Sequence, residues 1–156
     1  MFKTLRATLL TAAVVVETGL SLVGPACAQS SGPDAALGIW ETANGDIRFE
    51  MFADDDRYAG RIIYGALMVE PDGTFKRDVK NPDPALRGRS LEGIVFLTGL
   101  TWDPEDQRLE DGSLYLAPRG ETASARVTVE GETMELRAYR GTPMLGRTLE
   151  FRRVGR

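Results

Sequence analysis

Apolar and polar residues alternate with a period of two along much of the chain. The run from Ile47 to Met51 alternates apolar and charged side chains, and Tyr58 to Tyr64 follows it after a turn-forming run of aspartates. Successive side chains of a strand point to opposite faces, so this period is typical of half-buried strands. The two runs therefore predict a β-hairpin.

The same pattern continues toward the C-terminus and predicts seven to nine short strands with no amphipathic helix. The first strand opens at Gly38, and Gly141 to Gly146 forms the last turn. Further strands are expected over 91–102, 113–116, 126–130, 134–139 and about 147–154. The residues expected to face inward are Ile47, Phe49, Ile62, Val95, Leu97, Val127, Val129, Met134 and Leu136.

Short connections join nearly all of these strands, which favours antiparallel neighbours. The exception is the stretch from Gly65 to Ser90, and loops of that length are usually functional or packed down. A succession of hairpins hides its edges by closing into a barrel. The chain therefore predicts an all-β fold, a single antiparallel up-and-down β-barrel of about eight strands. Its interior is filled by side chains or holds one small ligand.

Residues 1–28 read as a signal peptide. Lys3 and Arg6 precede an apolar run over 9–16, and small residues end the segment at Ala28, where cleavage is expected. The apolar run is far shorter than the ~20 residues that span a bilayer, which disfavours a membrane anchor. A lipid-modified Cys27 is a lesser alternative. The prediction is a periplasmic or secreted protein, with 29–37 as a flexible lead-in and 38–156 as the barrel domain.

Charge and composition exclude several classes of function. The chain has 19 Lys and Arg against 23 Asp and Glu, no histidine and one cysteine. The acidic balance argues against nucleic-acid binding, which needs a basic face. The lack of histidine excludes Ser-His-Asp and Cys-His nucleophiles and every His-ligated metal site.

Two stretches resemble known families. Gly38-Ile39-Trp40 is similar to the G-x-W start of lipocalins. The block from Asp78 to Gly93, which contains Asn81-Pro82-Asp83-Pro84, resembles a bacterial family known as domain of unknown function 2147. The resemblance covers about residues 38–154. It implies a small exported protein with a lipocalin-like barrel and implies no established activity.

Six residues are candidates for ligand binding: Trp40, Arg61, Asn81, Arg87, Arg89 and Tyr139. Trp40 is either the floor of a ligand site or, as we favour, a structural plug with Arg152 or Arg153 stacked on its indole. For Arg61, exposure on the outside is the favoured placement, because an inward arginine would need an anionic partner.

The 78–89 block supports two interpretations. In the favoured one, Arg87 pairs with Asp78 or Asp83, and the loop ties itself down as a lid on the barrel. In the other, Arg87 and Arg89 receive an anionic head group at the barrel mouth.

The acidic runs at 54–56 and 103–106 are read as solvated hairpin tips, because neither fits the twelve-residue calcium loop. No metal site and no cofactor are predicted. Glu92, Asp111 and Glu121 could supply a carboxylate pair for glycoside hydrolysis, but nothing in their spacing places two of them across a cleft.

The sequence thus predicts an exported, monomeric barrel that is not an enzyme and binds a small, partly apolar or amphiphilic molecule in the cell envelope. Nucleic acid is not an expected partner, and membrane contact is expected only through the signal peptide. An envelope protein-interaction module with a self-filled barrel is the alternative. A carboxylate-based glycan hydrolase is less favoured.

Overall fold

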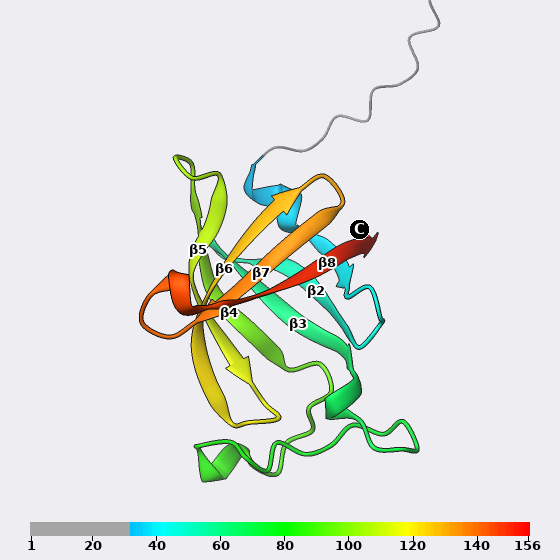
Figure 1. The fold of residues 1–156 in the computed structure, drawn as a ribbon. Coiled ribbons are helices and arrows are strands. Elements are labelled where there is room, and N and C mark those ends of the chain that lie inside the picture. The colour runs from blue at the N-terminus through cyan, green and yellow to red at the C-terminus, as the bar shows by residue number, and fades with distance from the viewer. Residues whose placement is uncertain (1–31) are drawn as a thin grey trace, which may run out of the picture.

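The computed structural model describes residues 32–156. The predicted signal peptide and its cleavage after Ala28 lie outside the described residues. Eight antiparallel strands form a closed barrel in chain order (Figure 1). They are β1 (Gly38–Glu41), β2 (Ile47–Asp54), β3 (Arg57–Gly65), β4 (Val95–Asp103), β5 (Arg108–Leu116), β6 (Glu121–Glu130), β7 (Thr133–Tyr139) and β8 (Arg147–Gly155). The predicted all-β up-and-down barrel is confirmed.

Within residues 32–156, four 3-10 helices lie outside the strands. They are η1 (Pro33–Ala36), η2 (Ala66–Met68), η3 (Pro84–Leu86) and η4 (Pro143–Leu145). Residues 29–37 are predicted to be a flexible lead-in, but residues 33–36 of this segment form η1. This helix packs on the barrel, because Ala35 and Ala36 are small enough to be buried against the core. In residues 32–156 no helix is long and apolar enough to cross a membrane.

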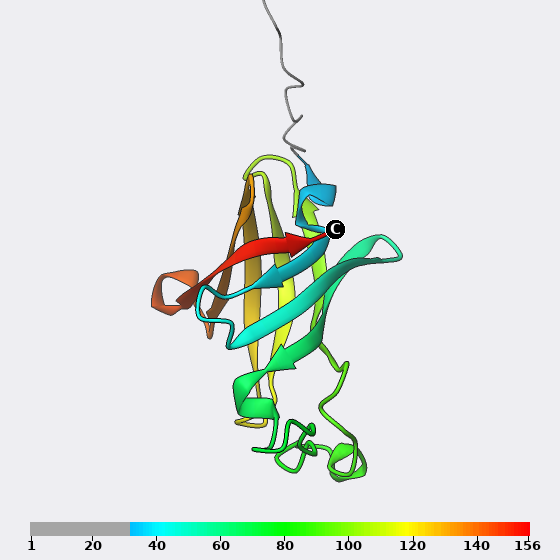
Figure 2. The same cartoon turned by 90° about the vertical axis from the view of Figure 1, so that its right-hand side faces the viewer.

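Up-and-down topology gives the barrel two distinct ends (Figures 1 and 2). The β1–β2, β3–β4, β5–β6 and β7–β8 connections emerge at one, which we call the loop end. The other carries η1 and the β2–β3, β4–β5 and β6–β7 turns, and we call it the plugged end. The β3–β4 loop, residues 66–94, hangs below the barrel in Figure 1.

The middle of the barrel is filled by its own side chains. Phe49 makes edge-to-face contacts with Phe96 and Phe151, with ring centroids 5.3 and 4.9 Å away. Fully or almost fully buried neighbours complete this core, namely Met51, Ile62, Leu97, Leu100, Leu109, Val127, Met134 and Leu136. Most of the predicted inward residues are among them, and Ile47 and Val129 are partly buried against the same cluster.

Val95 was predicted to face inward and does not. It pairs with Arg61 on the outside of the barrel and is 43% exposed. The register of β3 against β4 shifts between Gly60 and Arg61, so Phe96 and Leu97 are both buried. Such a bulge breaks the strict alternation on which the prediction rested. The predicted strand boundaries differ too, since β4 begins at Val95 rather than at 91 and β5 already begins at Arg108.

Candidate functional site

Trp40 closes the plugged end. Its side chain is fully buried, and its Nε1 donates a hydrogen bond to the Ala36 carbonyl at 2.8 Å. The Arg153 guanidinium lies 4.2 Å above the ring centroid. Its Nη atoms donate to the carbonyls of Leu37 and Ala35 at 2.5 and 2.6 Å, which ties η1 to the barrel. The structure therefore places Trp40 in a plug with Arg153, the interpretation favoured from the sequence.

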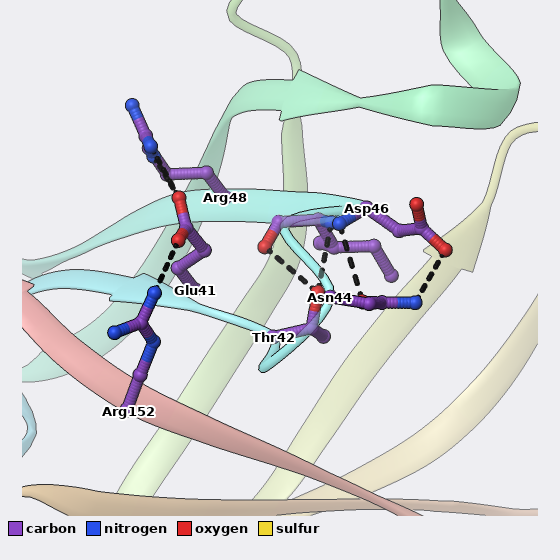
Figure 3. A network of polar contacts seen from close by, with 7 residues as sticks. Glu41, Thr42, Asn44, Asp46, Arg48 and Arg152 are labelled. Carbon is purple, nitrogen blue, oxygen red and sulfur yellow. Dashed lines mark hydrogen bonds and ion pairs between the residues drawn. The ribbon is translucent and has the colours of Figure 1, made fainter.

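A second network fastens the short strand β1 on both sides. Figure 3 shows the Glu41 carboxylate between Arg48 of β2 and Arg152 of β8. Arg48 Nε donates at 2.6 Å and Arg152 Nη2 at 3.1 Å. The hydrogen bond from Arg48, with both positive charges, lowers the pKa of Glu41 against the opposing effect of burial. Sequence reasoning missed this carboxylate, because its partners lie on two other strands.

Arg61 lies on the outer wall of the barrel. Its side chain is exposed, and its guanidinium stacks 4.7 Å from the centroid of the Phe52 ring. It is not brought together with the other candidate residues. Its outward placement agrees with the expectation that an inward arginine would need an anionic partner.

The candidate residues from the 78–89 block gather around the buried carboxylate of Asp78. One oxygen accepts from the Tyr115 hydroxyl at 2.6 Å. The other accepts from Asn81 Nδ2 at 2.7 Å and from Arg89, whose Nη2 lies 2.8 Å away. The Asp78 side chain has no exposed surface, while that of Arg89 is 38% exposed. The ion pair that sequence reasoning assigned to Arg87 is thus made by Arg89.

The electrostatics of this cluster follow from its donors. Burial alone would raise the pKa of Asp78, but hydrogen bonds from Tyr115, Asn81 and Arg89 outweigh it and hold the pKa below its ordinary value. The same geometry raises the pKa of Tyr115 to about 12, because burial and the adjacent carboxylate both oppose a phenolate. At neutral pH the cluster therefore holds one carboxylate anion, one guanidinium and a neutral phenol.

Asn81 and Arg87 organise the loop around this carboxylate. Asn81 Oδ1 accepts from the Asp83 amide at 2.9 Å, and Asp83 in turn caps η3 through the Ala85 amide. Arg87 Nε donates to the Asn81 carbonyl at 2.8 Å. Arg87 itself is exposed. The block is therefore a self-tied loop whose two arginines reach the surface of the loop end.

The same loop is fastened to the β5–β6 turn. Lys80 Nζ donates to the Pro118 carbonyl at 2.7 Å. Gly120 has a φ of +68°, and a Cβ built on it would lie 1.9 Å from the Lys80 carbonyl oxygen. Only glycine allows the two segments to approach this closely. Nothing in the local sequence around Gly120 identifies its distant partner, so this contact could not be predicted.

Exposed apolar side chains gather at the loop end. Ten large ones are exposed in residues 32–156, and nine of them lie in or beside the connections of this end, Val154 being the exception. The nine are Ile63, Tyr64, Leu67, Val79, Leu86, Val95, Met144, Leu145 and Leu149. The exposed large apolar side chains of the described residues are therefore concentrated at one end of the barrel.

Tyr139 lies apart from the Asp78 cluster, beside an open concavity of about 450 Å³. Ser113, Ser124 and Tyr139 are register neighbours across β5, β6 and β7 and line it. Ser124 and Tyr139 alternate with the inward pair Ala125 and Ala138, so this concavity is on the outer wall. Two smaller concavities, of about 80 and 160 Å³, flank η1 at the plugged end.

Among residues 32–156 no group of three or more acidic or cysteine side chains is placed to hold a metal ion. The acidic residues at 54–56 and 103–106 lie in the β2–β3 and β4–β5 turns of the plugged end or at the last strand residue before them. Of the carboxylates considered for hydrolysis, Glu121 forms an ion pair with Arg140 at 2.8 Å. Asp111 adopts a φ of +59° where the β5–β6 register shifts.

Comparison with known proteins identifies the family of this chain and a solved structure with a similar fold. Residues 38–153 match the model of a family described as an uncharacterized protein conserved in bacteria, DUF2147. The chain belongs to this family. No curated protein matches it in sequence. A solved structure from Helicobacter pylori, described as belonging to the lipocalin family, is 26% identical and superposes with a TM-score of 0.64. The alignment covers 76% of this chain and 82% of that protein.

In this DUF2147 protein, the block that carried the family resemblance has a clear structural task. Asp78, Asn81, Asp83 and Arg89 tie the long β3–β4 loop to itself, and Tyr115 anchors it to β5. The motif therefore shapes the loop end of the barrel.

Proposed function

We propose that this protein is an exported monomeric barrel that acts by binding, without catalysis, and takes up small amphiphilic molecules at its loop end. The observation that carries the proposal is the concentration of exposed apolar side chains at that end. The similarity to a protein described as a lipocalin supports it, because lipocalin barrels hold one small ligand.

The packed interior limits where the apolar part of such a ligand can bind. Phe49, Phe96 and Phe151 fill the middle of the barrel, so the ligand lies at the mouth and against the β3–β4 loop. Removing apolar surface from water contributes about 25 cal/mol per Å². Arg87 is the side chain that selects an anionic head group, since a guanidinium matches carboxylate or phosphate geometry, whereas Arg89 already pairs with Asp78.

Extraction tests this proposal directly. The full chain is expressed, the processed protein is purified from the periplasm, and an organic extract is analysed by mass spectrometry. We expect a stoichiometric amphiphile that an unrelated periplasmic protein lacks. Recovery of the protein only in the cytoplasm would contradict export, and a clean extract with no binding of an added fluorescent fatty acid would contradict ligand binding.

A pair of arginine variants locates the head group. Arg87→Ala is expected to lower the occupancy of the amphiphile and Arg57→Ala to leave it unchanged, since both residues are exposed but Arg57 begins β3 at the plugged end. Unchanged occupancy in Arg87→Ala together with a lower melting temperature would assign Arg87 a structural role only.

One observation favours a second candidate, an envelope protein-interaction module. The packed aromatic core resembles a barrel filled by its own side chains rather than one built around a ligand. In that case the exposed loop end contacts a protein. Capture of a defined partner by a protein with a clean extract would favour this function, and Leu67→Ser, which changes an exposed loop-end residue, should weaken the capture.

A further inference from the structure

The β7–β8 turn exposes two apolar side chains to solvent and is held in shape by hydrogen bonds from Arg137. Met144 and Leu145 of η4 are 88% and 83% exposed, more than any other large apolar residue described. Arg137 holds the turn from β7: it donates to the Pro143 carbonyl at 2.7 Å, to the Met144 carbonyl at 3.3 Å and to the Thr148 hydroxyl at 2.8 Å. Both views show η4 standing off the barrel wall (Figures 1 and 2).

The charge around this turn is positive. Residues 137–149 contain three arginines and no acidic residue, in a chain whose net charge is −4. Arg137 is used in bracing the turn, while Arg140 and Arg147 flank the apolar pair and are exposed. The ion pair of Arg140 with Glu121 joins two solvent-exposed side chains and holds Arg140 only weakly.

The plugged end carries the opposite charge. Its three turns, counted with the strand residue on each side, run over 54–57, 103–108 and 130–133 and contain eight acidic residues and two arginines. Arg153 and Arg156, which pair with Glu132, offset only part of this charge. These turns lie at the far end of the strands from the β7–β8 turn. The molecule is thus polarised, with acidic tips at one end and an apolar pair between arginines at the other.

We propose that the β7–β8 turn docks on an anionic phospholipid bilayer. Met144 and Leu145 enter the interface between head groups and acyl chains, and Arg140 and Arg147 contact lipid phosphates. Apolar side chains buried at the membrane interface and basic side chains near anionic head groups each add to membrane affinity. Repulsion of the acidic plugged end orients the barrel with its loop end toward the lipid, which goes beyond the binding of a free amphiphile.

Vesicle co-sedimentation tests the docking. The purified full chain is mixed with vesicles of phosphatidylglycerol and phosphatidylethanolamine, or of phosphatidylcholine alone. We expect binding to the anionic vesicles that weakens as salt is added, because the arginine contribution is screened. The double variant Met144→Ser with Leu145→Ser should weaken binding by roughly tenfold or more, since it removes the apolar burial.

Two further variants make the result specific to this turn. Arg147→Glu should weaken binding to anionic vesicles, whereas Leu67→Ser, an exposed apolar residue of η2 on another connection, should keep it within about twofold. Any contribution from residues 1–28 is the same in all of these chains. Unchanged binding by the double variant, equal binding to phosphatidylcholine, or no binding to either vesicle would overturn the proposal.

The docking and the proposed ligand are separable in one set of proteins. Arg87→Ala should lose the amphiphile and still bind anionic vesicles, because it leaves Met144 and Leu145 untouched. Loss of the amphiphile with retained vesicle binding would support docking as an independent property. Retained vesicle binding by the double variant would overturn docking by this turn, and a clean extract from the wild type would separately count against the proposed function.

Discussion

The two ends of the barrel differ in whether their large apolar side chains are buried or exposed. At the plugged end, Trp40 is fully buried and Arg153 donates hydrogen bonds to the carbonyls of Leu37 and Ala35. At the loop end, a buried carboxylate ties down a long loop, yet Met144, Leu145 and Leu67 remain in solvent. One end is closed by its own residues, whereas the other is held in shape but leaves apolar surface uncovered. The largest loss of stability is therefore expected from substitutions at the plugged end, whereas the proposed binding involves exposed side chains of the loop end.

The largest expected effect is at the plugged end. Trp40→Ala removes a fully buried indole, its hydrogen bond to Ala36 and the surface on which Arg153 stacks. We expect the free energy of unfolding to fall by about 3–5 kcal/mol, measured by urea denaturation. The exposed loop-end change Leu67→Ala should alter it by less than about 0.5 kcal/mol. Similar losses in the two variants would contradict the division between the ends.

The next effect is at the contact between the β3–β4 loop and the β5–β6 turn. Gly120→Ala places a Cβ against the Lys80 carbonyl, whereas Gly73→Ala, also at positive φ, meets no atom within 4 Å. Both variants have the conformational cost of about 1 kcal/mol, and Gly120→Ala should lose about 1–3 kcal/mol more. Thermal unfolding and proteolysis within 66–94 measure the difference. Equal behaviour of the two variants would show that the loop is not held there.

A comparable effect is expected from the buried carboxylate. Asp78→Asn removes the charge that Arg89 and Tyr115 face, and should lower the free energy of unfolding by about 1–3 kcal/mol at neutral pH. Because the folded-state pKa of Asp78 is lowered, its contribution is present above the ordinary value near 4 and is lost as pH falls through the folded pKa. Denaturation at several acidic pH values should show this loss in the wild type and a smaller one in the variant.

The free energy of unfolding at alkaline pH tests the same cluster from the other side of the pH range, with a smaller expected change. The pKa of Tyr115 is raised to about 12, so its contribution is present below about 10 and is lost as pH rises toward 12. Tyr115→Phe should cost about 1 kcal/mol at neutral pH and make the alkaline loss shallower. Tyr64→Phe, an exposed tyrosine for which no such partner is found, serves as the control. Identical alkaline profiles for the two variants would contradict the cluster.

Local periodicity predicted the fold well because strands are a local signal. The alternation at 47–51, 126–130 and 134–139 marked β2, β6 and β7, and the short turns between strands predicted an antiparallel barrel. The prediction failed at Val95, where a bulge changes which residues face inward, because the alternation of apolar and polar residues does not indicate a bulge.

The candidate site was predicted only in part, because its partners are distant in the chain. The 78–89 block was recognised as a tied loop, but the choice of Arg89 over Arg87 depends on how η3 turns the chain. Tyr115 reaches Asp78 from a strand 37 residues away, and Gly120 meets Lys80 only in the folded barrel. The polarity between the ends becomes visible only when the topology assigns each turn to an end.

Residue-resolved amide chemical shifts test most directly the claim that the loop end is the binding end. The protein is titrated with lysophosphatidylglycerol below its micellar concentration, which supplies both an apolar chain and an anionic head group. We predict that the changes concentrate in 63–68, 86–89 and 140–149. Changes centred on η1 and the acidic turns of the plugged end, or no changes at all, would contradict the account.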